Sequence, residues 1–475
     1  MNITFGKDID KAPAGYLRIR LTEEDRGTKR IIREGAGEKG VEWLELGAGK
    51  AADMNQRRFV TLCRSMVRAA KAAKYKKFAM QFDRTPKLFT NLQHLSPEQI
   101  AEIVGTNFEM ANFDFTTFKT APKNGWPGIT DVLACGESSK SIEVAVKRGQ
   151  EIGRAVNATR ELANTPGGDM TPRLLGAAAK ASVKGLPVKV TTLGRREMEK
   201  LGMGAILGVG RGSAHEPTFT VMEYRGGGKT RPIVLAGKGI TFDSGGINIK
   251  PSASIYEMHM DMSGAAAVIH AVALAARLKV KRNVIGLIPS AENMVGHDAL
   301  RPGDILKSLS GKTIEVTDTD AEGRLVLSDA LTYAKRFDPA VVVDVATLTG
   351  AAHIALGHYA SGLMTRDDAL ADQFLALGEL SGDYLWRLPL WDEYEASVKS
   401  DFADLKNHEI GGGKFGGASN GAIFLWQFAK ELKCPWAHLD IAPRMTPAPG
   451  EELSKGAIGT PVRFLISFIE SWEGK

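Results

Sequence analysis

From about residue 166 to the end of the sequence, short runs of apolar and β-branched residues alternate with longer stretches of helical periodicity. The runs with the length and apolar content of buried strands are VKVTTL (188–193), TFTVMEY (218–224), PIVLAG (232–237), NVIGLIP (283–289), TIEV (313–316), AVVVDVA (340–346) and AHLDIA (437–442). Helical stretches between them include LLGAAAKAS, MSGAAAVIHAVALAARL and RLVLSDALTYAKRF. Continuously apolar strands are typical of sheets covered on both faces, and alternation with helices favours parallel pairing. The sequence therefore predicts an α/β fold with a mixed, mostly parallel sheet.

The chain of 475 residues is long enough for more than one domain. The sequence predicts a small N-terminal α/β domain in residues 1–135. A Gly- and Pro-rich stretch near its end, KNGWPGITD (123–131), indicates a break in the chain's regular structure. Residues 136–165 predict a linker helix that joins it to a larger domain of residues 166–475.

Composition excludes several classes of protein. Hydrophobic residues make up 43% and charged residues 24% of the chain, which is ordinary for a soluble globular protein. The longest apolar run, residues 264–276, is too short to cross a bilayer, and the N-terminus lacks the pattern of a secretory signal. Cys63, Cys135 and Cys434 show no disulfide or CxxC spacing, so we expect a reducing, cytoplasmic setting.

The net charge of +6 is concentrated in residues 57–77, which carry eight basic residues and no acidic one. Arg57, Arg64, Arg68 and Lys71 recur at helical spacing, which could form a nucleic-acid-binding face. A solvated helix face is the simpler interpretation.

Acidic residues are unusually dense in TDTDAEGR (317–324), where Asp318, Asp320 and Glu322 alternate with other residues and Arg324 follows. If this segment stays extended to about Glu322, side chains two residues apart share a side. Carboxylates held so close together repel one another unless a cation lies between them.

A second polar stretch, residues 235–268, places Lys238, Asp243, Lys250 and Asp261 among glycines, just beyond a predicted strand. Open α/β sheets bind ligands at this end of their strands. Because TIEV is also predicted as a strand, the carboxylates of both stretches could converge on one crevice and share two divalent metal ions. The alternatives are that Asp261 is a helix N-cap and that the acidic segment is a solvated turn with an Arg–Asp surface pair.

These two stretches resemble the signatures of the leucine aminopeptidase (cytosol aminopeptidase) family, namely TDAEGRLVLSDAL and VLAGKGITFDSGGINIKP. The resemblance extends to ANTPGGDMTP, GMGAILGVGRGSA, DVATLTGA and WAHLDIA, and so covers essentially the whole of residues 166–475. It implies a small N-terminal α/β domain followed by a catalytic α/β domain, assembled as a cytoplasmic homohexamer.

The resemblance implies a metal-dependent aminopeptidase that removes the N-terminal residue of a peptide by means of two metal ions and a bridging water. One ion would be held by Lys238, Asp243, Asp261 and Glu322, and the other by Asp243, Asp320 and Glu322. Mn²⁺, Zn²⁺ or Mg²⁺ suits such an oxygen-rich set with one amine.

The resemblance also assigns catalysis to Lys250 and Arg324, with a bicarbonate ion as general base held by Arg324 and the backbone of Gly323 and Leu325. The positions that match the family's pocket for the first side chain are Met258, Thr347, Gly350, Ala442 and Met445. They are apolar or small, so Leu, Met and similar residues are the expected substrates.

Two residues depart from the family pattern. Asp318 stands where the family usually has asparagine, so it either adds charge beside the metals or points away from them. Arg444 stands where small residues are usual, and it could favour acidic substrates. Two alternative functions remain from the sequence: a two-metal phosphoesterase, and an aminopeptidase that also binds DNA, as some family members do, through residues 57–77.

Overall fold

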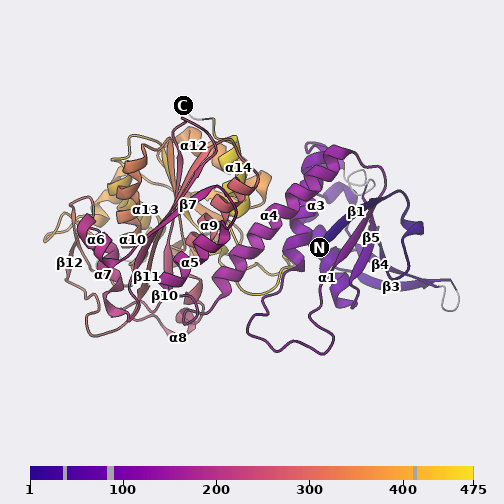
Figure 1. The fold of residues 1–475 in the computed structure, drawn as a ribbon, viewed down its shortest axis with the longest axis horizontal. Coiled ribbons are helices and arrows are strands. Elements are labelled where there is room, and N and C mark those ends of the chain that lie inside the picture. The colour runs from indigo at the N-terminus through magenta and orange to yellow at the C-terminus, as the bar shows by residue number, and fades with distance from the viewer. Residues whose placement is uncertain (36–39, 83–89, 410–414, 474–475) are drawn as a thin grey trace. The chain divides into compact units, whose positions relative to one another are not determined.

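The computed structural model describes residues 1–35, 40–82, 90–409 and 415–473 (Figure 1). The chain divides into two units: an N-terminal unit of residues 1–157 and 449–455, and a C-terminal unit of residues 158–448 and 456–475. The division between residues 157 and 158 falls inside helix α4 (Lys140–Asn164).

The N-terminal unit is built on a six-stranded sheet in the order β1-β6-β5-β2-β4-β3, in which only the β3–β4 pair is antiparallel. Its strands are β1 (Asn2–Gly6), β2 (Leu17–Thr22), β3 (Lys29–Glu34), β4 (Val41–Gly47), β5 (Lys77–Gln81) and β6 (Asp131–Cys135). Helices α1 (Gln56–Ala72) and α3 (Pro97–Asn112) pack against each other, and their apolar faces share one core with the sheet.

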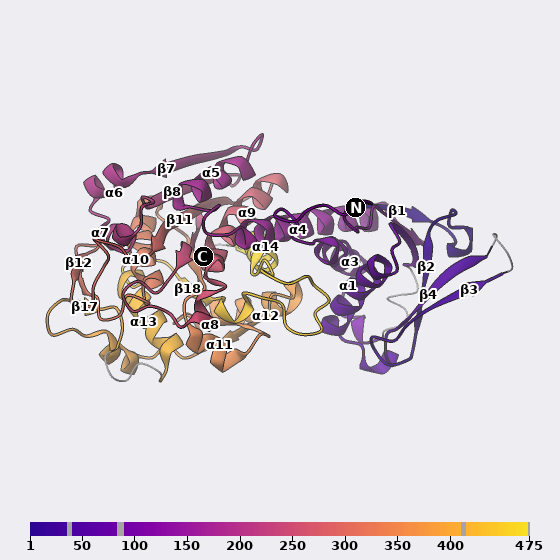
Figure 2. The ribbon, with the colours of Figure 1, turned by 90° about the horizontal axis from the view of Figure 1, so that it is seen from below.

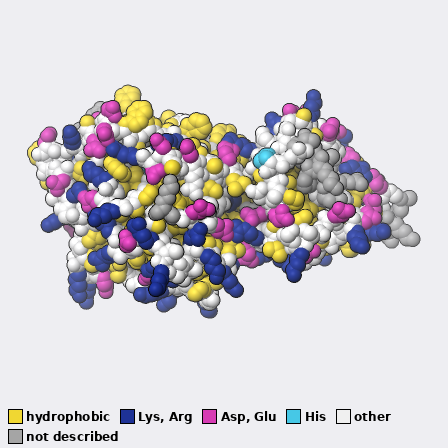
Figure 3. Space-filling view, turned by 90° about the horizontal axis from the view of Figure 1, so that it is seen from above, with side chains coloured by type: hydrophobic (Ala, Val, Ile, Leu, Met, Phe, Trp, Pro, Cys, Tyr) yellow, Lys and Arg dark blue, Asp and Glu magenta, His cyan; other side chains and the backbone are white. Residues whose placement is uncertain are grey.

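The basic residues of helix α1 are largely used inside this unit. Arg64 is 2% exposed and donates from Nε to Asn107 Oδ1 at 2.8 Å. Arg68 and Lys71 both pair with Asp114, at 3.0 and 2.6 Å. The prediction of a solvated basic face is therefore wrong for Arg64 and Lys71, because both side chains are buried. On the face drawn in Figure 3, Lys and Arg side chains are interspersed with Asp and Glu.

The C-terminal unit is built on a nine-stranded sheet in the order β16-β15-β18-β14-β9-β11-β8-β7, with β10 paired to β11 beyond this path. The pairs β16–β15, β18–β14, β14–β9, β9–β11 and β10–β11 are parallel, whereas β15–β18, β11–β8 and β8–β7 are antiparallel. The strands are β7 (Val188–Leu193), β8 (Thr218–Arg225), β9 (Ile233–Gly237), β10 (Gly239–Asp243), β11 (Asn283–Asn293), β14 (Val341–Ala346), β15 (Ser361–Met364), β16 (Leu385–Arg387) and β18 (Trp436–Asp440). The predicted α/β fold with a mixed, mostly parallel sheet is confirmed.

Helices cover both faces of this sheet. Figures 1 and 2 show α9 (Ser263–Arg277) and α10 (Gly323–Ala334) on opposite sides of the central strands, and each contacts β9, β11 and β14. Further helices on these faces include α5 (Pro172–Ser182) and α14 (Val462–Ser471) beside α9, and α7 (Gly204–Val209) and α13 (Gly417–Ala429) beside α10. Among the described helices, none combines the length and apolar character needed to span a membrane.

The predicted strand TIEV does not join the main sheet. It forms β13 (Thr313–Glu315), which pairs with β12 (Ile305–Lys307) and β17 (Leu405–Lys406) in a separate three-stranded sheet. The chain also does not stay extended to Glu322, which was the condition for side chains two residues apart to share a side. Asp318 Oδ1 accepts the backbone N–H of Asp320 at 2.8 Å, which turns the chain, and Glu322 already has helical torsions (φ −78°, ψ −33°) as the N-cap of α10.

Candidate metal centre

Lys238 lies between β9 and β10 and joins several segments through one buried ammonium group. Its Nζ lies 2.8 Å from Asp261 Oδ2 and 2.8 Å from Glu322 Oε1, and it donates to the carbonyl oxygen of Thr347 at 3.0 Å. Burial lowers the pKa of Lys238, but the carboxylates of Asp261, Glu322 and Asp243 outweigh it, so the pKa lies above its ordinary value. The structure therefore brings the 238, 261 and 322 positions together.

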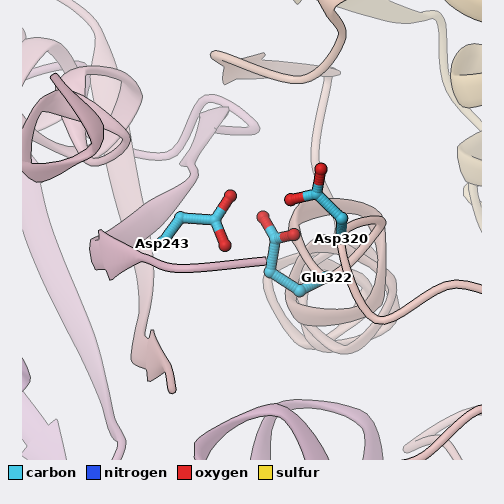
Figure 4. Close-up of side chains that lie close together, drawn as sticks. All are labelled: Asp243, Asp320 and Glu322. Atoms are coloured by element: carbon cyan, nitrogen blue, oxygen red, sulfur yellow. The ribbon is translucent and has the colours of Figure 1, made fainter. Parts of the chain in front are cut away.

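Three carboxylates converge beside this lysine. One oxygen each from Asp243, Asp320 and Glu322 lies within 4.8 Å of the other two. Figure 4 shows Asp243 reaching from the end of β10 toward Asp320 and Glu322, which project from the turn before α10. Lys250 Nζ lies 2.8 Å from Asp243 Oδ2 and also pairs with Asp320 Oδ1. Burial, together with the neighbouring charges of Glu322 and Asp243, raises the pKa of Asp320 to about 7.

The charge balance of this cluster fits divalent cations. Four carboxylates and two ammonium groups leave a formal excess of two negative charges. Four of these six side chains are buried, namely Lys238, Asp243, Asp261 and Glu322. Burial and the neighbouring carboxylates raise the pKa values of Asp261 and Glu322, as expected where negative charge is under-compensated. Glu322 Oε2 is buried and has no hydrogen-bond partner among the described residues. Carboxylate oxygens with one amine nitrogen suit Mn²⁺, Zn²⁺ or Mg²⁺.

Asp261 does not act as the N-cap of α9, which was the alternative from the sequence. The N-cap is Met262, and Asp261 lies one residue before it. Asp261 Oδ1 instead accepts the hydroxyl hydrogen of Thr347 at 2.7 Å, and its Oδ2 faces Lys238. The side chain is therefore held in the cluster from both oxygens.

Two glycines allow the backbone to come this close. A Cβ on Gly323 would lie 2.5 Å from Cε and 2.6 Å from Nζ of Lys238. Gly245, in the DSGG turn, has φ +86°, and its N–H donates to Asp243 Oδ1 at 2.9 Å. The N–H of Gly245 therefore fixes one oxygen of Asp243. The positive φ of Gly245 that places this N–H is a backbone conformation that favours glycine.

Arg324 follows the cluster at the start of α10 and is 5% exposed. Its Nη1 donates to the carbonyl oxygen of Asn407 at 2.7 Å, whereas its Nε has no partner among the described residues. Burial lowers the pKa of Arg324 to about 10, against the opposing effect of Glu322 and Asp318. The backbone N–H of Leu325, which the resemblance assigns to bicarbonate, already donates to the carbonyl oxygen of Glu322 at 2.9 Å.

Asn407 is a positioning residue that the sequence did not reveal. Its side chain accepts from the N–H of Thr317 at 2.8 Å and donates to the carbonyl oxygen of Asp318 at 2.6 Å, while its own carbonyl oxygen holds Arg324. Asn407 begins the glycine-rich stretch NHEIGGGKFGGASNGAIF (407–424), of which residues 410–414 lie outside the described residues. No pattern in a single sequence distinguishes such an amide from an ordinary loop asparagine.

The residues expected to line the substrate pocket begin short helices or lie next to helix and strand ends. Met258 begins η6 (Met258–Met260), Thr347 follows β14, Gly350 begins α11 (Gly350–Leu356), Ala442 begins η9 (Ala442–Arg444), and Met445 follows η9.

Asp440 ties two of these segments together. Its Oδ1 accepts from the N–H of Leu348 at 3.1 Å and from that of Ala442 at 3.2 Å. Arg444 is 2% exposed and donates to the carbonyl oxygen of His358. Its guanidinium group therefore helps to hold the loop after α11.

Known proteins resemble this chain in sequence and in fold. Residues 157–466 match the family described as "Cytosol aminopeptidase family, catalytic domain". A probable cytosol aminopeptidase of Azoarcus sp. (strain BH72) is 41% identical over 466 residues, which cover 97% of this chain and 91% of that protein.

Two solved structures have a similar fold. The bottromycin maturation enzyme BotP, in complex with Mn, is 30% identical with a TM-score of 0.84, over 97% of this chain and 99% of that one. A mutant of tomato leucine aminopeptidase is 28% identical with a TM-score of 0.86, over 99% of this chain and 96% of that one.

Proposed function

Because the chain belongs to the cytosol aminopeptidase family, it is a metal-dependent aminopeptidase, and we propose that the cluster described above holds two divalent ions. One ion would be held by Lys238, Asp243, Asp261 and Glu322, and the other by Asp243, Asp320 and Glu322. The observation that carries this proposal is that oxygens of Asp243, Asp320 and Glu322 lie within 4.8 Å of one another. Oε2 of Glu322 supports it, because it is buried and has no hydrogen-bond partner among the described residues. Mn²⁺ or Zn²⁺ is the proposed metal, with Mg²⁺ as a third candidate.

Bound divalent ions would polarise the scissile carbonyl group, lower the pKa of a water molecule and bind the free α-amine of the substrate, which accounts for removal of one N-terminal residue. Lys238 would act as a neutral amine, and its ammonium proton would be released to solvent. Lys250, whose Nζ already lies among the carboxylates, would donate to the substrate oxygen that gains negative charge, a contribution of about 3 kcal/mol.

Arg324 is proposed to hold a bicarbonate ion that accepts a proton during hydrolysis. The arrangement of its guanidinium supports this, because Nη1 is anchored on Asn407 while Nε is unpartnered, and a planar guanidinium suits a planar oxyanion. The resemblance also assigns the backbone of Gly323 and Leu325 to the binding of bicarbonate. Since the N–H of Leu325 is engaged within α10, we propose that Arg324 provides the main contact.

The substrate pocket is proposed to prefer Leu, Met and similar first residues. Met258, Thr347, Gly350, Ala442 and Met445 would line it, and their loops are held near the cluster by Asp440 and by the contacts of Thr347 with Lys238 and Asp261.

We further propose a cytoplasmic homohexamer. Large aromatic side chains of the C-terminal unit are exposed, which is typical of surfaces that other copies cover: Trp386 (64%), Trp391 (64%), Phe402 (77%) and Phe415 (85%). Light scattering of the purified protein would measure the mass directly.

The function is tested by removing metals with a chelator, adding back Mn²⁺ or Zn²⁺, and measuring hydrolysis of a panel of amino-acyl p-nitroanilides. We expect activity to vanish on chelation, to return with metal, and to be highest for Leu and Met. Asp320→Asn should lower kcat/KM by about 10²-fold or more, because a preorganised charged group is lost. Its matched control is Asp338→Asn, whose side chain is 83% exposed and pairs with Arg231, and which should stay near wild type.

Full activity after thorough chelation would contradict the metal mechanism. Turnover of p-nitrophenyl phosphate without turnover of leucine p-nitroanilide would favour the phosphoesterase alternative instead.

A further inference from the structure

Asn293 is the last residue of β11 and lies directly beside the proposed metal centre. It is 2% exposed, and its amide nitrogen Nδ2 donates to Asp243 Oδ1 at 2.8 Å and to the carbonyl oxygen of Thr319 at 2.9 Å. A carboxylate and a carbonyl oxygen are both acceptors, so the orientation of this amide is unambiguous, and both of its hydrogens are used. One neutral side chain thus connects the segment that carries Asp243 with the segment that carries Asp320 and Glu322.

Both ends of this connection are themselves held firmly. On one side, Asn293 pairs with Asp243 in the parallel register of β10 and β11, and its carbonyl oxygen accepts from Ser244 N at 3.0 Å and Ser244 Oγ at 2.7 Å. Thr319 also binds the segment that follows Asp243 directly: its N–H donates to Asn248 Oδ1 at 3.0 Å, and its hydroxyl donates to the carbonyl oxygen of Gly245. Asn293 adds to these bonds between the two segments a contact with the carboxylate of Asp243 itself.

The two oxygens of Asp243 are consequently distinct. Oδ1 accepts from Gly245 N and from Asn293 Nδ2, whereas Oδ2 is the oxygen that faces Lys250 Nζ at 2.8 Å. A carboxylate without these donors could rotate about its last bond and exchange its oxygens. The two donors therefore determine which oxygen is offered to the interior of the cluster.

We propose that Asn293 is a positioning residue of the metal centre: it orients Asp243 and fixes its spacing from Asp320 and Glu322 through the backbone of Thr319. This inference rests on the proposed function, since it concerns the same metal ions. Partners that orient metal ligands typically change metal affinity about 10- to 100-fold when they are removed. Asn293 does not touch the reacting atoms, so its loss should weaken metal binding more than it slows turnover at saturating metal.

The same strand offers a matched control in Asn283, which begins β11. It is also 2% exposed, and its Nδ2 donates to the carbonyl oxygens of Gly228 at 3.0 Å and Thr230 at 2.6 Å. Asn283→Ala therefore removes the same amide, with a similar number of hydrogen bonds, away from the metal cluster.

The experiment measures Mn²⁺ binding to the full-length wild type, Asn293→Ala and Asn283→Ala by titration calorimetry and by electron paramagnetic resonance, after chelation and without substrate. Thermal unfolding of the metal-free proteins is recorded alongside. We expect Asn293→Ala to bind Mn²⁺ 10- to 100-fold more weakly, to keep kcat within a few-fold at saturating Mn²⁺, and to lose no more thermal stability than Asn283→Ala. Asn283→Ala should bind Mn²⁺ within two-fold of the wild type.

Wild-type Mn²⁺ affinity in a folded Asn293→Ala protein would overturn this inference while leaving the metal centre intact, and so would equal weakening in Asn283→Ala. A wild type that binds no Mn²⁺ or Zn²⁺ would overturn the metal centre itself. If Asn293→Ala does not fold, Asn293→Ser is used, because its hydroxyl can replace one of the two donors. It should then weaken Mn²⁺ binding by an intermediate factor, and unchanged binding would count against the role.

Discussion

At the scale of one residue, Lys238 is closely packed on several sides. Its ammonium contacts Asp261, Glu322 and Thr347 at once, and the backbone of Gly323 passes against its side chain. A lysine among carboxylates could serve only to neutralise their charge, and its exact position would then matter little. The close approach of Gly323 makes its exact position matter, because nothing larger than hydrogen fits on that side.

Gly323→Ala tests this packing. The added Cβ would lie 2.5 Å from Lys238 Cε, so the lysine must move, and a displacement of about 1 Å can cost about 10²-fold in rate. We expect a loss of that order in kcat/KM for leucine p-nitroanilide, together with weaker Mn²⁺ binding. Gly168→Ala is the control, because a Cβ there meets nothing within 4 Å. Equal activity in the two variants would contradict the packing argument.

The charged residues of the cluster could be predicted from the sequence, because carboxylates spaced so closely repel one another unless a cation lies between them. Asp243, Asp320 and Glu322 do lie together. The amides that hold them could not be predicted, since Asn293 and Asn407 each lie far along the chain from the segment they bind. An asparagine is uncharged, so its burial in the sequence pattern does not indicate a functional partner. Its role can be recognised only when the structure shows which distant segments it binds.

At the scale of elements, apolar content identified strands well but not their partners. Val188–Leu193 and the strand around Val341–Ala346 were predicted almost to the residue. TIEV was predicted equally as a strand, yet β13 joins a different sheet. Burial pattern reports that a strand has covered faces, but it carries no information on which neighbouring strand supplies the hydrogen bonds. The turn after Asp318 was missed for a related reason, because it depends on a side-chain cap.

Strands β14 and β18 also contain a buried ion pair that makes stability depend on pH. His438 Nδ1 lies 2.5 Å from Asp344 Oδ1, and Trp436 Nε1 donates to Asp344 Oδ2 at 2.7 Å. Burial lowers the pKa of His438, but Asp344 outweighs this effect, with a smaller contribution from Asp440 and an opposing one from Arg324. The pKa therefore lies above its ordinary value in the folded protein.

The sign of the pH effect follows from this shift. Below pH 6.5 the histidine is protonated in both the folded and the unfolded chain, and the pair contributes in full. As the pH rises above 6.5, the unfolded state loses its proton first, so the free energy of unfolding falls by up to about 1.4 kcal/mol per pH unit until the folded pKa is passed. We expect the difference in Tm between the wild type and His438→Gln to shrink from pH 6 to pH 9. A constant difference over that range would contradict protonation of His438 in the fold.

At the scale of the whole molecule, the residues proposed to bind metal and to act in catalysis all belong to the C-terminal unit of residues 158–448 and 456–475. The family match, residues 157–466, covers nearly the same part of the chain. The positive net charge had suggested a second function in the N-terminal unit. There, Arg64 and Lys71 are buried, and Arg68 pairs with Asp114. Net charge counts ionisable groups, whereas a nucleic-acid surface also requires that they be exposed.

The central claim is that this buried cluster of carboxylates is organised around two divalent ions, and diffraction at the manganese absorption edge tests it most directly. Crystals grown with Mn²⁺ should show two anomalous peaks per chain, one among Lys238, Asp243, Asp261 and Glu322 and the other among Asp243, Asp320 and Glu322. Lys250 and Arg324 should lie beside the peaks without binding either one. Well-ordered crystals in saturating Mn²⁺ that show no anomalous density at this cluster, with Lys238 and Lys250 still bridging its carboxylates, would contradict the account.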